Sequence, residues 1–291
     1  MLRTILILGR VSNLPTVWTN VLAGWFLVGG AWNWELLWIE IGVSLLYIAG
    51  MTLNDAFDAK WDREHAPERP IPSGAISGGK VLALGAIQML AGAAVLLTLT
   101  RIQWPWLACL VAAIVIYDAV HKRTPVAVLV MGACRGLVYL MAASAISRDG
   151  YFPHLLWVLA GTVVAYVAGI TVLARSERGP DAPRWEKWLG RALVYAPLFA
   201  LAIAPGEMTD AEGTWIKLTL WIVSLVFVIG WITIVSTWFL KSETGLAIAL
   251  LIAGITIIDG SVVWFSDSIA GMVALALLPI TLLFQRFIPA T

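Results

Sequence analysis

Four side chains that carry oxygen stand close together in one short stretch of the sequence. Asn54, Asp58 and Asp62 are spaced four residues apart, and Asp55 precedes Asp58 by three. Residues at these spacings share one face of a helix, so a helix here would bring three carboxylates and an amide together. Carboxylates that meet repel one another and need a compensating cation. Their hard oxygens suit Mg²⁺, which proteins commonly share between a few carboxylates and the phosphate oxygens of a substrate.

Basic residues beside the cluster offer a second interpretation. Lys60, Arg63 and Arg69 lie within the same stretch or shortly after it. Any of them could pair with Asp58 or Asp62 at a helix end surrounded by water. The residue types alone leave both interpretations open.

The composition indicates the class of fold that must position these residues. Of the 291 residues, 60% are hydrophobic and 13% are charged, and the mean hydropathy is +0.87. A soluble domain has roughly 45–50% apolar and about 25% charged residues, so this chain has too few charges to cover a surface that faces water. A soluble enzyme, a disordered chain and a disulfide scaffold are excluded. The formal net charge of +1 gives no indication of an ionic partner, and we expect no nucleic-acid partner.

Ten long apolar stretches divide the chain. A transmembrane helix needs about 20 residues, and backbone polar groups in lipid must be satisfied within their own segment, which favours helices. We therefore expect an all-α, polytopic transmembrane bundle formed by residues 1–291 as a single domain. The stretches lie at 14–31, 36–57, 81–100, 104–120, 125–146, 155–174, 189–204, 215–238, 245–263 and 268–286.

The basic residues orient this bundle. Three of the 19 Lys and Arg residues fall on one side, Arg101, Arg148 and Lys217, and Arg135 lies within a stretch. The other fifteen fall on the opposite side, and cytoplasmic loops carry the excess of Lys and Arg. We expect both termini and the cluster at 54–62 to be cytoplasmic. The chain is then an integral, multi-pass protein among membrane lipids, expected in the bacterial inner membrane with its active site facing the cytoplasm.

Three motifs on that side resemble those of a known family. Asn54-Asp55-x-x-Asp58-x-x-x-Asp62, with Arg69-Pro70-Ile71-Pro72-Ser73-Gly74 downstream, is similar to the first aspartate-rich motif of the UbiA superfamily of intramembrane prenyltransferases. Two further segments are similar to that family, Arg10-x-Ser12-Asn13-Leu14-Pro15-Thr16 and Tyr117 with Lys122-Arg123-Thr124-Pro125. Orientation and length also fit, so the resemblance covers most of the chain.

The resemblance implies a transferase that binds an isoprenyl diphosphate through Mg²⁺ at the cytoplasmic rim. The isoprenyl group would pass to a lipophilic acceptor inside a cavity that is open to lipid. By position, Asn54, Asp55 and Asp58 match the family's metal and diphosphate ligands, with Asp62 as a further metal ligand. Asp55, Asp58 and Lys122 are the expected catalytic residues. The expected diphosphate-binding residues on these motifs are Asn54, Arg69, Lys122 and Arg123.

The sixth apolar stretch departs from the family pattern. There the family carries a second aspartate-rich motif, which helps to hold a second Mg²⁺, whereas residues 171–181 contain no Asp-x-x-x-Asp. The resemblance leaves Glu177 as the one inherited metal-binding carboxylate, and it places Arg175 and Arg178 where the second ion would lie. Planar guanidinium groups match phosphate oxygens well. These arginines therefore either replace the metal in binding the diphosphate, or they mark a chain that has lost the ionising chemistry.

Two other departures concern the overall pattern. The family core usually has nine helices, so the stretch at 268–286 is expected to form a tenth. Pro67 also stands near the place where the family often has a basic residue before Arg69. These features are similar to a divergent, EboC-like branch of the superfamily, whose chemistry the resemblance does not fix.

An arginine stands in the middle of the fifth apolar stretch. Arg135 lies within Gly132-x-x-x-Gly136, where the glycines permit close approach of another helix. A charged side chain at this depth is costly and usually faces a cavity or a carboxylate. Arg135 is thus either a polar contact for the acceptor at the cavity floor or a structural ion pair with Asp259. The ring of Tyr117 could line the same substrate cavity and stabilise a carbocation, or it could simply pack.

Two functions follow from these observations. The first is a Mg²⁺-dependent prenyltransferase, which the carboxylates beside basic residues at one membrane rim favour. The second is a non-catalytic protein that binds or transports an isoprenoid or amphipathic metabolite on the same scaffold, which the missing carboxylates of the sixth stretch favour.

Overall fold

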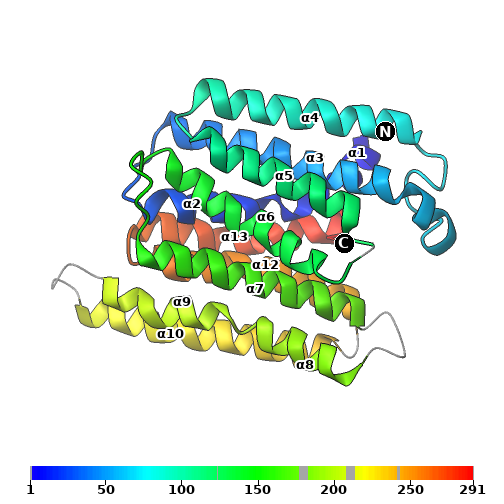
Figure 1. Ribbon diagram of the computed structural model, residues 1–291. Coiled ribbons are helices and arrows are strands. Elements are labelled where there is room, and N and C mark those ends of the chain that lie inside the picture. Colours follow the sequence, from blue (N-terminus) through cyan, green and yellow to red (C-terminus); the bar gives the residue numbers. More distant parts are fainter. Residues whose placement is uncertain (1, 123, 177–182, 208–213, 241–242, 291) are drawn as a thin grey trace.

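The computed structural model describes residues 2–290 except 123, 177–182, 208–213 and 241–242. Within these residues all regular secondary structure is helical (Figure 1). The α-helices are α1 (Leu2–Leu8), α2 (Leu14–Phe26), α3 (Trp34–His65), α4 (Gly78–Leu99), α5 (Trp104–Val120), α6 (Ala127–Ser144), α7 (His154–Ser176), α8 (Arg184–Leu193), α9 (Pro197–Ile203), α10 (Thr214–Ile234), α12 (Thr244–Val263) and α13 (Ser268–Phe287). Three short helical segments join them, η1 (Val11–Asn13), η2 (Ala204–Glu207) and η3 (Val235–Phe239).

Each of the ten predicted apolar stretches coincides with a helix or a pair of helices in the described part of the chain. Eight of these segments are long and apolar enough to cross a membrane by length and composition, and α5 is a shorter apolar helix. The predicted all-helical membrane fold is therefore confirmed. The stretch at 189–204 is interrupted between α8 and α9, because Pro197 cannot continue a helical hydrogen-bond ladder from the preceding residues.

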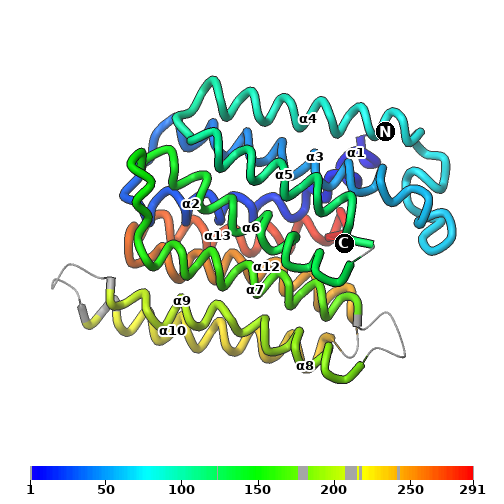
Figure 2. The backbone as a smooth tube through the Cα atoms, viewed as in Figure 1, coloured from blue at the N-terminus to red at the C-terminus, as the bar shows by residue number. Residues whose placement is uncertain are grey.

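The long helices run side by side, with α4 at one edge of the bundle and α8, α9 and α10 at the other (Figure 1). The trace in Figure 2 shows α6 beside α7, with the chain then leaving the central helices for the outer pair α9 and α10. Both ends of the chain lie at the end of the bundle that carries the connection from α3 to α4. The cytoplasmic placement of this end remains a prediction.

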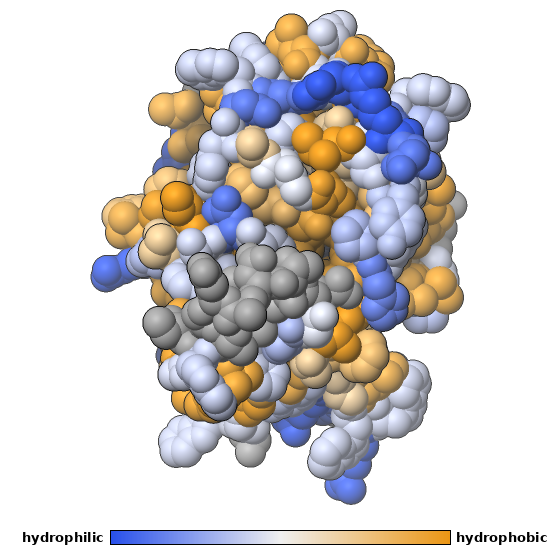
Figure 3. Space-filling view, turned by 90° about the vertical axis from the view of Figure 1, so that its left-hand side faces the viewer, coloured by the Kyte–Doolittle hydropathy of each residue, from blue (hydrophilic) through white to orange (hydrophobic). Residues whose placement is uncertain are grey.

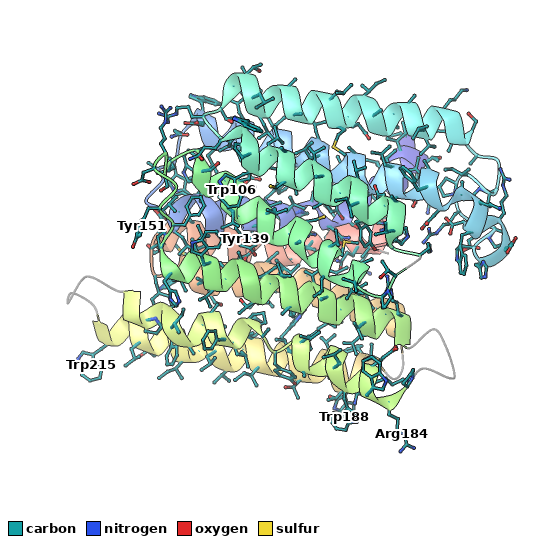
Figure 4. The ribbon with its side chains drawn as sticks, in the orientation of Figure 1. Trp106, Tyr139, Tyr151, Arg184, Trp188 and Trp215 are labelled. Carbon is teal, nitrogen blue, oxygen red and sulfur yellow. The ribbon has the colours of Figure 1, made fainter. Side chains whose placement is uncertain are left out.

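Aromatic side chains mark both ends of the bundle. Figure 4 places Trp215 and Tyr151 at one end and Trp188 with Arg184 at the other. Trp188 and Trp215 are 70% and 81% exposed, as expected for amphipathic rings in the headgroup zone of a bilayer. The end that carries the connections α2–α3 and α6–α7 shows hydrophilic residues among hydrophobic ones (Figure 3).

Glycines let the central helices approach closely. A Cβ atom added at Gly132 of α6 would lie 2.3 Å from the backbone oxygen of Val164 on α7, and one added at Gly24 of α2 would lie 2.3 Å from the backbone oxygen of Tyr139. Both are backbone oxygens, so neither can move unless its whole helix shifts. Close backbone packing of α6 against α2 and α7 thus fixes the depth and direction of the α6 side chains, including Arg135.

We expect Gly132→Ala to lower the stability of the protein by about 1–3 kcal/mol, because the methyl group overpacks the α6–α7 contact. Thermal unfolding in detergent measures the effect. Gly161→Ala on α7 is the matched control, since a Cβ there meets nothing within 4 Å. Equal melting temperatures for the two variants would contradict this account of the packing.

Candidate active site

The C-terminal end of α3 brings the four predicted oxygen donors together. With 32 residues, α3 is about 48 Å long at 1.5 Å per residue, well beyond the roughly 30 Å of a hydrocarbon core. Its last turns carry Asn54, Asp55, Asp58 and Asp62, which are only 3–7% exposed. The prediction that they share one face is confirmed. These four side chains are buried rather than surrounded by water, but the pairing of Asp58 and Asp62 with Arg69 that the second interpretation allowed is present.

Arginines from two other segments lie against this face. Arg69, in the connection after α3, places Nη1 2.9 Å from Asp62 Oδ2, 3.8 Å from Asp55 Oδ1 and 3.9 Å from Asp58 Oδ2. Burial opposes the charge of Arg69, but the carboxylates of Asp62 and Asp55 outweigh it and raise the pKa of the guanidinium. Arg10 approaches from the other side, with Nη2 3.6 Å from Asp55 Oδ1.

The end of α5 supplies two more basic side chains. His121 Nε2 lies 3.1 Å from Asp58 Oδ1, and Lys122 Nζ lies 3.3 Å from Asp58 Oδ2. Arg175 at the end of α7 donates from Nη2 to the backbone oxygen of His121 at 3.0 Å. Helices α3 and α7 therefore meet three connections, which carry Arg10, Arg69 and His121 with Lys122, at a cluster in which each of the three aspartates has a basic neighbour.

A cavity of about 820 Å³ opens beside this cluster. Asp58, Arg69, Lys122 and Arg175 line its polar side, and Tyr117 lies on its wall. On the α7 side, the described lining residues are Thr171, Ala174 and Arg175, without a carboxylate. The structure brings together the predicted residues of α3, the α3–α4 connection, α5 and α7. Three predicted residues, Arg123, Glu177 and Arg178, lie outside the described part of the chain.

A second, apolar cavity of about 60 Å³ lies further inside the bundle. Tyr117 lines both cavities, and Asp118 and Arg135 line the inner one. A third cavity, of about 370 Å³, is also lined by Asp58 and Lys122, and Phe57 contributes to its wall. The side chain of Tyr117 therefore stands between the polar cavity and the apolar one.

Arg135 is held in place by a buried network. Its Nη1 donates to Asn20 Oδ1 at 3.0 Å, and Asn20 Nδ2 donates to Asp259 Oδ2 at 2.8 Å. The hydroxyl of Tyr139 donates to Asp259 Oδ1 at 2.6 Å. The guanidinium also lies over the ring of Tyr47, 5.3 Å from its centroid. The described residues show no direct ion pair between Arg135 and Asp259, because Asn20 lies between them. Arg135 lines the inner cavity, and its contact with an acceptor stays a prediction.

Sequence reasoning missed Asp118 as a functional candidate. Its side chain is 4% exposed, Asn54 Nδ2 donates to its Oδ1 at 3.2 Å, and its Oδ2 is buried with no hydrogen-bond partner. An acidic residue inside the apolar stretch 104–120 was the available signal. The ion pairs of Arg10 and His121 with α3 were missed too, because no sequence spacing shows which loop folds back onto a helix.

The donors at the cluster suit Mg²⁺ in chemistry. They are hard carboxylate and amide oxygens, and Asp55 Oδ1 is buried without a hydrogen-bond partner. Within the described residues, no group of three His, Cys, Asp or Glu side chains is arranged to hold a metal ion. The cluster in this structure is thus an array of ion pairs whose acidic oxygens fit one Mg²⁺ by type.

The chain was compared with known protein families and curated sequences. The model of the UbiA prenyltransferase family matches residues 13–182. The 4-hydroxybenzoate octaprenyltransferase of Paracidovorax citrulli is 28% identical over 209 residues, which cover 66% of this chain and 70% of that protein. Those of Albidiferax ferrireducens and Cupriavidus necator are each 30% identical, over 58% and 59% of this chain. The aligned part spans 57% and 61% of these two relatives, so their full length is not covered.

Two solved structures share the fold. One is described as a digeranylgeranylglyceryl phosphate synthase, with a TM-score of 0.63 at 17% identity, covering 92% of this chain and 99% of that one. The other is a UbiA homologue from Aeropyrum pernix K1 without ligand, with a TM-score of 0.62 at 18% identity, covering 88% and 97%. At these identities the likeness shows the fold alone, and it agrees with the helical bundle described above.

Proposed function

Because the chain belongs to the UbiA prenyltransferase family, we propose that it transfers an isoprenyl group from an isoprenyl diphosphate to a lipophilic acceptor within the membrane. The observation that carries this proposal is the buried array of carboxylates and basic groups beside a cavity of about 820 Å³, with a smaller apolar cavity on the other side of Tyr117. The polar side of the larger cavity suits a diphosphate, whereas the inner cavity, at about 60 Å³, must open before an acceptor ring can enter it. We place the reaction at the cytoplasmic rim of the bacterial inner membrane.

The acidic residues would hold the metal. Asn54, Asp55 and Asp58 would bind Mg²⁺, with Asp62 as a further ligand, and Glu177 is proposed by resemblance alone. When bound, the ion neutralises the negative charge that develops on the departing diphosphate. Holding these donors on one rigid helix keeps them in position before the substrate arrives.

The basic residues would bind the diphosphate directly. Arg69, Lys122 and Arg175 all line the 820 Å³ cavity, and guanidinium groups can contact two phosphate oxygens at once. Arg175 occupies the α7 wall, where no described residue supplies a carboxylate. We propose that Arg175 takes the place of a second metal there, together with Arg178. Arg123 is proposed as a further diphosphate contact.

The proposed reaction transfers the isoprenyl group and releases diphosphate. The allylic C–O bond breaks, and its electron pair leaves with the diphosphate. A nucleophilic carbon of the acceptor forms the new C–C bond to the allylic carbon and afterwards releases one proton. The apolar inner cavity excludes water, which would otherwise capture the carbocation. The face of Tyr117, which lies between the two cavities, can stabilise that cation.

Asp118 is the proposed acceptor of the released proton. Its Oδ2 is buried without a partner at the boundary of the inner cavity, while Asn54 holds Oδ1 in place. A general base must lie within hydrogen-bond reach of the proton that it accepts. Among the acidic residues of this site, Asp118 alone lines the inner cavity.

Arg135 is the proposed contact for the acceptor. It lines the inner cavity with a guanidinium that the Asn20–Asp259–Tyr139 network holds in place. A cation in that position favours an acceptor that carries an anionic group. The relatives named above are 4-hydroxybenzoate octaprenyltransferases, and a hydroxybenzoate is an acceptor of this kind.

The carboxylate assignment predicts the behaviour of two variants. Asp55→Ala and Asp58→Ala should lose the Mg²⁺-dependent binding of geranylgeranyl diphosphate, because each removes a metal ligand and leaves its basic neighbours unpaired. Binding to protein in nanodiscs, with and without Mg²⁺, measures this. Glu68→Ala, an exposed carboxylate in the α3–α4 connection, is the control. If both aspartate variants bound geranylgeranyl diphosphate as the parent does, the carboxylate assignment would be wrong.

The parent protein also tests the non-catalytic alternative. If it binds the isoprenyl diphosphate but releases no diphosphate with any acceptor, that alternative is supported.

The acceptor assignment predicts that Arg135→Gln raises the KM for an anionic aromatic acceptor roughly ten- to a hundredfold, the value of a hydrogen bond to a charged group. The affinity for the isoprenyl diphosphate should stay unchanged, because Arg135 does not line the outer cavity. Arg148→Gln, an exposed arginine in the α6–α7 connection, is the control. An unchanged acceptor KM in Arg135→Gln would refute this role.

The proton-acceptor role predicts a specific kinetic change in Asp118→Asn. Its kcat should fall by about 10²–10⁴-fold, the usual contribution of a general base. Deuterium on the acceptor carbon that is alkylated should then slow the variant more than the parent, because proton release becomes rate-limiting. A purely structural role for Asp118 would weaken diphosphate binding through Asn54 and would leave the isotope effect unchanged.

A further inference from the structure

A separate groove of about 650 Å³ runs between α2, α3 and α13. It shares no lining residue with the three cavities of the candidate active site. Its walls are apolar, and Leu37, Ile41 and Val273 at its edges are 36–44% exposed. In a membrane this groove therefore faces lipid. Its volume lies within the range of roughly 300–1,000 Å³ that is usual for small-molecule sites.

One carboxyl group lines this groove without a partner. Glu40 Oε2 is buried and has no hydrogen bond, and the described residues give Glu40 no ion pair. The other polar groups nearby are satisfied by one another. Trp18 Nε1 donates to Ser44 Oγ at 2.9 Å, and Ser44 Oγ donates to the backbone oxygen of Glu40 at 2.6 Å. The side chain of Glu40 is thus an unsatisfied acceptor within the span, which is costly and marks a functional candidate.

The position of Glu40 along α3 places it near the headgroup zone. Trp34 begins the helix and Trp38 precedes Glu40 by two residues, and tryptophans favour the membrane interface. At 1.5 Å per residue, Glu40 lies about 9 Å inward from Trp34. Polar atoms of a lipid head can reach this depth, while the chain of the same lipid lies along the apolar wall below.

We propose that this groove binds a membrane lipid whose head carries a primary amine, with its ammonium group donating to Glu40 and its acyl chain between α3 and α13. Glu40 lacks both a donor and a counter-charge, and a primary ammonium supplies both. A choline head has the charge but no N–H donor, and an anionic head without an amine would be repelled. This site is independent of the proposed transferase reaction.

Native mass spectrometry of the purified protein with an equimolar mixture of phosphatidylethanolamine, phosphatidylcholine and phosphatidylglycerol of identical acyl chains tests the proposal. The parent should retain phosphatidylethanolamine over phosphatidylcholine by roughly tenfold, the value of one charge-assisted hydrogen bond. In Glu40→Gln and Glu40→Leu this ratio should fall close to one. Glu35→Gln is the control on the same helix, since Glu35 pairs with Arg101 outside the groove, and it should keep the parental ratio.

Three results would overturn the proposal: equal retention of the two zwitterionic lipids by the parent, a preference for phosphatidylglycerol, or an unchanged ratio in both Glu40 variants. Thermal unfolding of the variants separates a lost site from a lost fold. Their melting temperatures should match or exceed that of the parent, because each removes a buried carboxyl group that has no protein partner.

Discussion

The burial of acidic side chains at the end of α3 requires positive charge beside them, and this requirement organises that end of the molecule. A carboxylate removed from water loses hydration that only counter-charges and hydrogen bonds can replace. Asp58 gains basic partners from His121 and Lys122 just after α5. Asp62 gains a counter-charge and a hydrogen bond from Arg69. Arg175 then ties α7 to the same end of α5. One electrostatic constraint thus joins segments that are distant in sequence at the mouth of one cavity.

The same ion pairs bear on how a diphosphate would bind. In this structure Arg69 and Lys122 already have acidic partners, which a diphosphate must displace to use them, whereas Arg175 contacts a backbone oxygen. A divalent cation would occupy the carboxylates as the phosphate oxygens occupied the arginines and the lysine. The cation and the diphosphate together would replace the present ion pairs with new ones. Either of them alone would leave some buried charges without a counter-charge. The described residues contain no group of three ligands arranged for a metal ion, so the proposed binding of Mg²⁺ and diphosphate requires these ion pairs to rearrange.

Hydropathy predicted the ten apolar segments, and helical periodicity predicted the shared face of Asn54, Asp58 and Asp62. Both features depend only on residues that are close together in the sequence. The partners of that face could not be predicted. Arg10 reaches Asp55 across more than forty residues of chain, and no local rule fixes such a contact. A direct ion pair of Arg135 with Asp259 was one of the two alternatives predicted, but Asn20, a neutral residue that gave no signal, lies between them. Glu40 gave the same signal as Asp118, an acidic residue inside an apolar stretch, but only the structure shows that its carboxyl lacks a partner.

The charged residues inside the bundle differ in whether the protein itself supplies their hydrogen bonds and counter-charges. A residue that the protein satisfies fully has a structural role, and one that it satisfies in part stays available to a ligand. Asp259 is fully buried and receives hydrogen bonds from Asn20 and Tyr139, so it needs nothing further. Its negative charge in turn offsets the cost of keeping Arg135 within the membrane, although Asn20 separates the two. Because Asn20 rather than Asp259 contacts the guanidinium, Arg135 is stabilised without being neutralised by direct contact. An arginine held in this way can stand at the floor of an apolar cavity before any ligand arrives, which an isolated arginine could do only at much greater cost.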